Sequence, residues 1–420
     1  MKVALVLEQF DPPRGGLERW SWRFATELVR RGHEVHVVAK HFSEATQAMP
    51  IVAHRLDGVG SRLGFAEAAQ AKLITLAPDV IHDMGCGWYC DVFHPHGGSW
   101  AALSERKLLM LPAWKRPLKR TVDRLLPRQR EFHSLLLRQY ADSGQLLVAL
   151  SQAVADDFRQ FHGVPAERIR VVYNGVDTDH FSPQRRLRYR AAVRRRLGIP
   201  EEKVVALIVA HNFRLKGVPT LLRAMGRLRA PLHRSGRRRL PVHLVVVGGR
   251  HLRPWQRMAG RLGIAGAVSF VGPQDETAPY YAAADLYVHP TFYDTCSLVV
   301  LEAAASGLPV ITTRVNGVSE LLNHGVDSLL LADPADADEL AEQMRALLDE
   351  SQRQEMGAAA RQTALRHTLK RNVKEILAVY EEVLGLRRNE TLTRTRATAQ
   401  SNGQPQAVAE ASESTDFRLL

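Results

Sequence analysis

Short apolar runs alternate along the chain with longer segments whose apolar residues recur every three or four positions. Residues 3–7 form the first run, and from Leu17 the apolar positions follow helical spacing until Gly32 ends the segment. Residues 34–40 form the next apolar run. A strand, a glycine-containing loop, a helix and a second strand make a βαβ unit, so the pattern predicts a parallel sheet.

The same rhythm predicts two α/β domains. Further strands are expected at 79–84, 146–151 and 168–176 and, after a restart, at 204–210, 242–249, 268–272, 285–290 and 308–313. We expect two Rossmann-like, doubly wound domains, over 1–182 and 183–365, that face each other across a cleft. Ligands of such sheets bind beyond the carboxyl ends of the strands, so this cleft is the expected binding site.

The C-terminal part of the chain changes in composition. Residues 366–386 are predicted to form a helix that packs back on the N-terminal domain. From Arg387 the sequence turns to Thr, Ser, Gln, Ala and Asn with few apolar residues. Such a segment cannot bury enough surface to order itself, so 387–420 is predicted to be a disordered tail.

The composition is that of a globular protein, but the charge is unusual. The 57 Lys and Arg residues exceed the 44 Asp and Glu residues, which gives a formal net charge of +13 over 420 residues. This excess favours an anionic partner, and composition alone leaves open nucleic acid, a membrane surface and a phosphorylated ligand. An arginine-rich stretch at 185–196 lies at the expected connection between the domains.

Cysteine content and hydropathy bear on the compartment. Cys86, Cys90 and Cys296 are too few and too scattered for a disulfide framework, which favours a reducing compartment. No segment reaches the roughly 18 apolar residues of a membrane span, and the first apolar run is too short for a signal peptide. We therefore expect a cytoplasmic protein, with peripheral contact to the inner face of the membrane as a further possibility.

Glycines open the first predicted helix. Gly15 and Gly16 come shortly after a strand, where backbone N–H groups and the positive end of the helix dipole suit a phosphate. A tight turn that needs glycine is the alternative. The Lys-Ser/Thr pair of a P-loop is absent, which argues against a Walker-type ATPase.

Two cations follow the first strand of the second domain. Arg214 and Lys216 can clamp a diphosphate, Arg as a bidentate fork and Lys as a point charge. The alternative is a pair of solvated loop charges.

Two carboxylates stand eight residues apart in the most informative segment, 289–311. Asp294 lies in a loop after a strand, and Glu302 lies along the helix that follows. Both can face the cleft and accept hydrogen bonds from paired hydroxyls, as sugar and ribose recognition requires. A capping role for Asp294 is the alternative, but it leaves Glu302 unexplained in an apolar helix. The N-terminus of this helix can meet a phosphate as well, through Thr295, Cys296, Ser297 and Leu298.

Two histidines and an aspartate-rich turn are further candidates. His94 and His96 precede two glycines, and no third metal ligand is evident near them. His96 is predicted to form hydrogen bonds in the cleft, with a local structural role as the alternative. Asp177 and Asp179 form a D-x-D sequence, which binds a divalent ion in some sugar-transfer enzymes. Its place in a turn favours a structural role instead, so no metal site is predicted.

Basic and apolar residues are interleaved over 106–138, where only Asp123 and Glu131 are acidic. This combination suits an anionic membrane surface. A solvated helix whose apolar residues belong to the core is the alternative. Nucleic acid is not an expected partner, because no nucleic-acid motif accompanies the charge.

Several motifs occur in an order that resembles one family. They are GGLERW (15–20), SQAVADDF (151–158), VVYNGVDTDHF (171–181), RLKG (214–217), VVVGG (245–249), AADLYVHPTFYDTCSLVVLEAAASGLPVI (283–311) and NGVSELL (316–322). From Val3 to about Leu384 the chain resembles the retaining glycosyltransferases of family four, which have the two-domain GT-B fold. Within that family it is most similar to the lipopolysaccharide core glucosyltransferase type.

The resemblance implies roles for the residues of the second domain. Glu302 matches the residue that holds the nucleotide ribose. Asp294 stands where the family usually has Glu and matches the residue that contacts the transferred sugar, although its side chain is shorter. Arg214 and Lys216 match the pair that neutralises the leaving diphosphate.

Two roles in the first domain and a reaction are also implied. Gly16 matches the loop that closes over the diphosphate, and His96 matches the acceptor-domain histidine near the transferred sugar. The implied reaction is retaining transfer of a hexose, best matched by glucose from UDP-glucose, to a hydroxyl of a glycan or lipid-linked acceptor. Lipopolysaccharide or cell-envelope polysaccharide synthesis is the implied setting, without a metal or other cofactor. The alternatives are a sugar-nucleotide 2-epimerase of the same fold and a nucleic-acid-binding module.

Overall fold

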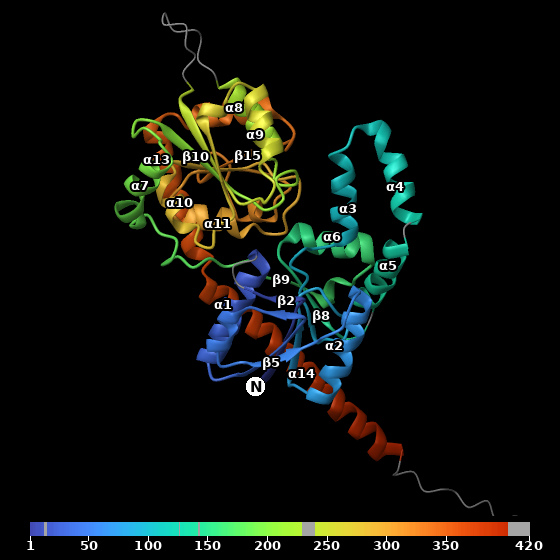
Figure 1. Cartoon of the computed structure of the whole chain (residues 1–420). Coiled ribbons are helices and arrows are strands. Elements are labelled where there is room, and N and C mark those ends of the chain that lie inside the picture. The colour runs from blue at the N-terminus through green and yellow to red at the C-terminus, as the bar shows by residue number, and fades with distance from the viewer. Residues whose placement is uncertain (12–14, 126, 142, 229–239, 402–420) are drawn as a thin grey trace, which may run out of the picture.

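The computed structural model describes residues 1–420 except 12–14, 126, 142, 229–239 and 402–420, and it leaves the side chains of 123–130 and 389–401 undescribed. Two α/β domains face each other, and the chain passes between them twice, once after β9 and once between α13 and α14 (Figure 1). Two Rossmann-like, doubly wound domains were expected from the sequence, and this expectation is confirmed.

The N-terminal domain is built on seven parallel strands in the order β5-β3-β1-β6-β7-β8-β9. Their bounds are β1 Lys2–Val6, β3 Glu34–Ala39, β5 Val52–Arg55, β6 Val80–Asp83, β7 Val92–Phe93, β8 Leu146–Ala149 and β9 Ile169–Val171, with β2 Gln9–Phe10 and β4 His41–Phe42 forming a separate pair. The helices are α1 Gly16–Arg30, α2 Arg62–Leu76, α3 Trp100–Leu109, α4 Arg116–Leu125, α5 Pro127–Tyr140 and α6 Gln152–His162, with 3-10 turns at Glu44–Ala48, Ala113–Lys115 and Ala166–Arg168.

The C-terminal domain is built on six parallel strands in the order β12-β11-β10-β13-β14-β15. Their bounds are β10 Val204–Val209, β11 Val242–Val247, β12 Val268–Gly272, β13 Leu286–His289, β14 Val310–Thr313 and β15 Ser328–Leu331. The helices are α7 Arg185–Arg196, α8 Val218–Arg227, α9 Arg253–Arg261, α10 Ala278–Ala283, α11 Leu298–Ala305, α12 Ala337–Ala346 and α13 Glu350–Arg366, with 3-10 turns at Ala265–Ala267 and Gly317–Leu321.

Both faces of the C-terminal sheet are buried. In the central strand β10, Val205 and Leu207 belong to one hydrophobic cluster, whereas Ala206 and Ile208 belong to another. A strand covered on both sides has to be apolar at consecutive positions, which explains the continuous run that marked it in the sequence. In each sheet the strand order reverses beside the first strand of the domain, at β1/β6 and at β10/β13. These are the points at which such sheets bind ligands.

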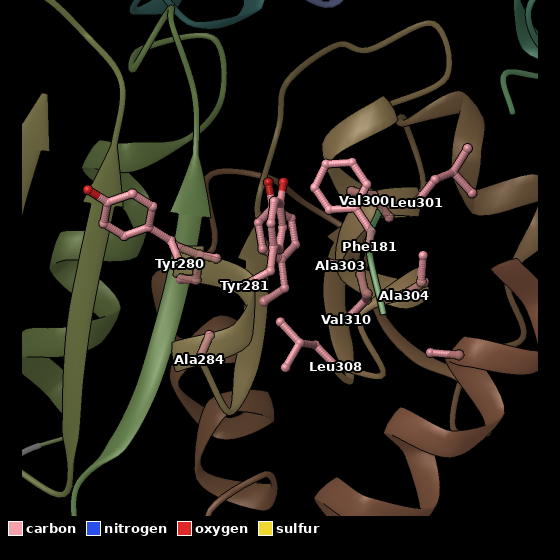
Figure 2. Packing of buried hydrophobic residues seen from close by; sticks show 14 of the residues in the cluster. Phe181, Tyr280, Tyr281, Ala284, Val300, Leu301, Ala303, Ala304, Leu308 and Val310 are labelled. Carbon is pink, nitrogen blue, oxygen red and sulfur yellow. The ribbon is translucent and has the colours of Figure 1, made fainter. Parts of the chain in front are cut away.

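The segment that follows β9 is anchored in the core of the second domain. Figure 2 shows Phe181 beside Tyr281, and their rings meet edge to face with centroids 5.5 Å apart. Leu308 and Val310 complete this part of the cluster, and all four side chains are at least 95% buried. The chain therefore enters the second domain through its hydrophobic core.

The arginine-rich stretch at 185–196 is a docked helix, α7. Arg186, Arg190 and Arg194 lie one turn apart and all pair with Asp285, over 3.1, 2.8 and 2.5 Å. They also donate hydrogen bonds to the backbone oxygens of Ala283 and Ala284 at the end of α10. One face of this basic helix thus holds the second domain together.

Helix α14, Leu369–Ser401, returns to the N-terminal domain (Figure 1). Its residues Val373, Ile376 and Tyr380 are fully buried in the cluster that lies under β1, β6 and β7. We expected disorder from Arg387, but the helix continues to Ser401. Arg387 pairs with Asp91 and donates a 2.8 Å hydrogen bond to the backbone oxygen of Asp79, so the predicted boundary falls inside an anchored helix, which adds residues cooperatively. The rest of the predicted tail, 402–420, lies outside the described residues.

Candidate active site

A lysine and an aspartate meet at the switch point of the C-terminal sheet, where β10 and β13 are neighbours. Lys216, in the loop after β10, donates a hydrogen bond from Nζ to Asp294 Oδ2 over 2.5 Å, and another to the backbone oxygen of Tyr293 over 3.3 Å. The two loops touch closely, because a Cβ on Gly217, whose φ is +73°, would lie 1.9 Å from the oxygen of Pro290. Any larger residue at 217 would push the pair apart.

Asp294 is held as a carboxylate. Burial opposes its ionisation, but Lys216 and His289 together hold the pKa of Asp294 well below its ordinary value. His289 is fully buried, with Nε2 3.5 Å from Asp294 Oδ2. The carboxylate is therefore engaged beside the loop and does not cap α11, nor does the side chain of Ser297 at the capping position. The structure excludes the capping alternative for Asp294.

Glu302 lies in a different environment two turns along α11. It is 4% exposed, and Tyr281 donates a 2.9 Å hydrogen bond to its Oε2. Arg19 of α1, in the other domain, lies 3.6 Å from its Oε1. Burial raises the pKa of Glu302, while Arg19 and the Tyr281 hydrogen bond oppose the rise. A small interdomain cavity is lined by Glu302, Arg19, Arg23 and Leu298, so this carboxylate faces the space between the domains.

Two helix N-termini from opposite domains face each other at this space. Gly15 is the N-terminal capping residue of α1, and Gly16 begins the helix. A Cβ on Gly16 would lie 3.5 Å from Cδ1 of Leu298, the first residue of α11. Because each helix start carries a partial positive charge, the two together favour an anion between them.

The two predicted cations differ in their surroundings. Lys216 is partly buried and paired, as described above. Arg214 is exposed, and within the described part of the chain no hydrogen bond or ion pair engages its side chain. Lys216 is thus positioned before any ligand arrives, and Arg214 is available to solvent.

His96 lies against the donor-side loop from the N-terminal domain. Thr295 donates a 2.8 Å hydrogen bond to the backbone oxygen of His96. The His96 ring packs on Trp20 and His94, with centroids 4.5 and 4.2 Å away, and burial lowers its pKa to about 3. His96 is therefore a neutral imidazole near pH 7. His94 is fully buried and its Nδ1 lies 3.1 Å from His82 Nε2, so it serves the local structure.

Contacts between the domains include residues that the sequence did not single out. Glu320 accepts hydrogen bonds from the backbone N–H groups of Gln152 and Ala153, over 2.7 and 2.8 Å, and from the hydroxyl of Tyr173 over 2.7 Å. It thereby caps α6 of the opposite domain. Its motif, NGVSELL, was noted, but a cap across domains has no local signal. Cys296 is held in the same way, because its backbone oxygen accepts a 2.6 Å hydrogen bond from the Asn174 amide.

Metal ligation finds no support in the described residues, among which no group of three or more His, Cys, Asp or Glu side chains is placed to hold an ion. Asp177 Oδ1 accepts hydrogen bonds from the backbone N–H groups of Asp179 and His180, over 3.2 and 2.9 Å. The D-x-D sequence therefore closes a turn, as its position predicted.

A cavity of about 440 Å³ adjoins the site on the N-terminal side. It lies where β1, β6 and β7 end, and α3 and α5 cover it. Gly97 and Gly98, which follow His96, form part of its wall, as do Leu17 and Glu18 of α1. A Cβ on Gly98, whose φ is +71°, would lie 2.2 Å from the hydroxyl of Tyr293. The cavity and the Asp294 loop therefore share a boundary.

Helices α3 and α4 stand out from the N-terminal sheet beside the other domain (Figure 1). Trp114, Leu118 and Val122 are 74%, 66% and 45% exposed along this projection. Lys115, Arg116, Lys119 and Arg120 are interleaved with them. The apolar residues are thus outside the core over this part of the chain. No described helix is long and apolar enough to cross a membrane.

Comparisons with known proteins agree with this geometry. Residues 14–180 match the family described as Glycosyltransferase Family 4, and residues 202–350 match Glycosyl transferases group 1. A D-inositol 3-phosphate glycosyltransferase from Geodermatophilus obscurus is 30% identical over 87% of this chain and 84% of its own length. Another, from Catenulispora acidiphila, is 36% identical, but the chain spans about half of that relative, 47%.

Solved structures share the fold. WaaG, a glycosyltransferase involved in lipopolysaccharide biosynthesis, superposes with a TM-score of 0.75 at 23% identity, over 89% of this chain and 98% of WaaG. Anabaena HepE in complex with UDP and glucose superposes with a TM-score of 0.66 at 20% identity, over 91% and 99%. Fold and site thus define a glycosyltransferase of the GT-B type. The chain belongs to glycosyltransferase family 4.

Proposed function

We propose that the protein transfers a hexose, with glucose from UDP-glucose as the best candidate, to a hydroxyl of a glycan or lipid-linked acceptor, with retention of anomeric configuration. The Lys216–Asp294 pair at the β10/β13 switch point carries this proposal. It places a fixed cation and a fixed carboxylate between two helix N-termini and next to the neutral His96. Such a set suits a nucleotide diphosphate sugar, which has an anionic part and a hydroxyl-rich part.

The charge that develops during the reaction determines the role of each group. As the sugar–phosphate bond breaks, negative charge grows on the leaving diphosphate and positive charge grows on the sugar ring. Lys216, Arg214 and the starts of α1 and α11 stabilise the first, because they are in place before the reaction begins. Asp294 accepts hydrogen bonds from the sugar hydroxyls, and its negative charge favours the developing cation.

The remaining groups orient the donor and the acceptor. Glu302 accepts hydrogen bonds from the ribose hydroxyls. His96, neutral at working pH, offers a hydrogen bond to the transferred sugar and adds no positive charge beside it. In the proposed front-face reaction the leaving phosphate takes the proton of the attacking hydroxyl, and no metal takes part.

The reaction is tested by pairing binding with product analysis. A thermal-shift screen of UDP-glucose, UDP-galactose, UDP-N-acetylglucosamine and GDP-mannose identifies the donor, since a ligand of the native state raises Tm. Transfer is then followed by NMR of the product anomer, and UDP-glucose should yield the α-linked product. An inverted product would overturn retention. An epimer formed from donor alone would establish the 2-epimerase instead, and stabilisation by RNA but not by any nucleotide sugar would favour the nucleic-acid module.

For the acceptor side we propose that the projection formed by α3 and α4 lies on an anionic membrane surface, as synthesis of lipopolysaccharide or another cell-envelope polysaccharide requires. Exposed Trp114 and Leu118 can enter the interface, while neighbouring cations each contribute about 1 kcal/mol. Sedimentation with anionic vesicles at low salt tests this, with Trp114→Ser as the variant and Leu187→Ser, exposed on α7, as the matched control. Absence of binding by the unaltered protein would rule the surface out.

A further inference from the structure

The acceptor cavity next to the site carries an unusual set of polar groups. Of the side chains that line it, Glu8 and Glu18 bear negative charge and Arg62 bears positive charge. The lining therefore has a formal charge of −1, although the protein as a whole has +13. The cavity departs from the rest of the molecule in the sign of its charge.

The single cation of the lining is already engaged. Arg62 Nε lies 3.8 Å from Glu8 Oε1, and its guanidinium lies over the rings of Phe132 and Trp100, 5.0 and 5.8 Å from their centroids. A guanidinium that rests on two aromatic faces beside a carboxylate has much of its charge compensated. An added phosphate would compete with Glu8 for it.

Hydrogen-bond acceptors dominate the polar atoms of the lining. Oε1 of Gln9 is buried, and no described group donates a hydrogen bond to it. Carboxylates, such as those of Glu8 and Glu18, accept hydrogen bonds but cannot donate them. The complementary ligand is one that brings donors. A phosphate dianion also has only acceptor oxygens, and it would face two carboxylates in a confined space.

Aromatic surface completes the lining. Trp100 and Phe132 meet edge to face, with centroids 4.9 Å apart, and Tyr140 and Phe93 lie deeper. Flat apolar surface of this kind covers the C–H face of a pyranose or cyclitol ring, while the ring hydroxyls reach the acceptor oxygens at the edge. The volume of about 440 Å³ lies within the range of small-molecule sites, roughly 300–1,000 Å³.

We infer that this cavity binds an uncharged, hydroxyl-rich ring as the acceptor terminus and discriminates against a phosphorylated one. The inference rests on the proposed function, because it concerns the acceptor of that reaction. It separates this chain from what its relatives' names say, since those proteins are named for D-inositol 3-phosphate.

Matched pairs of probes test the discrimination directly. Binding of myo-inositol and of inositol 3-phosphate, and of methyl glucoside and glucose 6-phosphate, is measured by ligand-observed NMR with UDP present. The neutral member should bind at least about tenfold more tightly at low ionic strength, and added salt should narrow the difference. Equal or tighter binding of the phosphorylated members, or no binding of either neutral ring, would overturn the inference.

A charge variant locates the effect in the cavity. Glu8→Gln releases Arg62 and brings the lining to zero charge, so it should tighten inositol 3-phosphate binding several-fold and reduce the discrimination. Glu44→Gln, on an exposed 3-10 turn of the same domain, is the control and should leave the ratio unchanged. An unchanged ratio in Glu8→Gln would contradict the inference. The result is separable from the proposed reaction, because stabilisation by UDP reports the donor site regardless of the acceptor.

Discussion

The loop around Asp294 and the helix around Glu302 lie in one short segment, yet they treat a buried carboxylate in opposite ways. Asp294 has Lys216 at 2.5 Å, and its pKa falls. Glu302 has a phenol at 2.9 Å and a guanidinium at 3.6 Å, and its pKa rises. A close cation outweighs the cost of removing a charge from water, whereas a more distant one reduces that cost without cancelling it. The loop is built for charge, and the helix for hydrogen bonding.

The largest effect is expected where the charge is. Lys216→Ala removes the preorganised cation and leaves Asp294 buried with less compensation, so turnover should fall by a factor of about 10² or more. Steady-state kinetics at saturating donor measure this, with Lys374→Ala, exposed on α14, as the control. Near-normal turnover would remove the diphosphate role of Lys216.

Neutralising the partner comes next. Asp294→Asn keeps the shape of the side chain but not its charge, so turnover should drop about 10- to 100-fold while UDP alone still raises Tm. The donor product of the variant should be assayed with UDP-glucose, because the sugar contact is the one lost. If UDP-glucose turnover persisted and only UDP affinity fell, Asp294 would belong to the nucleotide side of the site.

A smaller and different change is expected on the helix. Glu302→Gln retains a hydrogen-bond acceptor but loses the charge-assisted bonds to the ribose, which contribute about 1.5–3 kcal/mol. The donor KM should rise about tenfold or more, and kcat should change little. Glu342→Gln, exposed on α12, is the matched control. A fall in kcat with unchanged KM would instead place Glu302 with the reacting atoms.

Stability against pH gives the finest comparison. Asp294 has a lowered pKa, so its ionised form stabilises the fold above its ordinary pKa, and this contribution is lost as the pH falls through the lowered value. Glu302 has a raised pKa, so its protonation favours the folded state as the pH falls through the raised value. Between pH 7 and 4, Glu302→Gln should therefore be most stable relative to the unaltered protein at pH 7, and this advantage should shrink in acid. Calorimetric Tm values decide it; an advantage that grows in acid would reverse the assignment.

Two arginine-rich segments show where sequence reasoning reached its limit. The stretch at 185–196 was expected as a connection, and it is a docked helix because Asp285 and the end of α10 receive its arginines. The stretch at 106–138 left core and surface roles open, and over Trp114 and Leu118 it is exposed. Both read alike as strings of charge. Which one was buried depended on a partner distant in sequence.

The shortest strands also escaped prediction. Of those not expected, β7 has two residues and β5 lies at the sheet edge with three of its four residues exposed. Neither leaves an apolar run long enough to stand out, because a strand of this kind buries little surface of its own. The long buried strands, such as β10 and β11, were located to within a few residues.

Local pattern alone determined the two α/β domains, the parallel sheets and the loops that carry Gly15, Lys216, Asp294 and Glu302. Periodicity and turn residues act over a few positions, and the switch-point rule turns strand order into a site. Tertiary structure decided the charge states of Asp294 and Glu302, the cap that Glu320 places on α6, and the negative lining of the acceptor cavity. Those depend on distances and burial between residues far apart in the chain, and a pKa or a cavity exists only once folding has brought them together and removed the water.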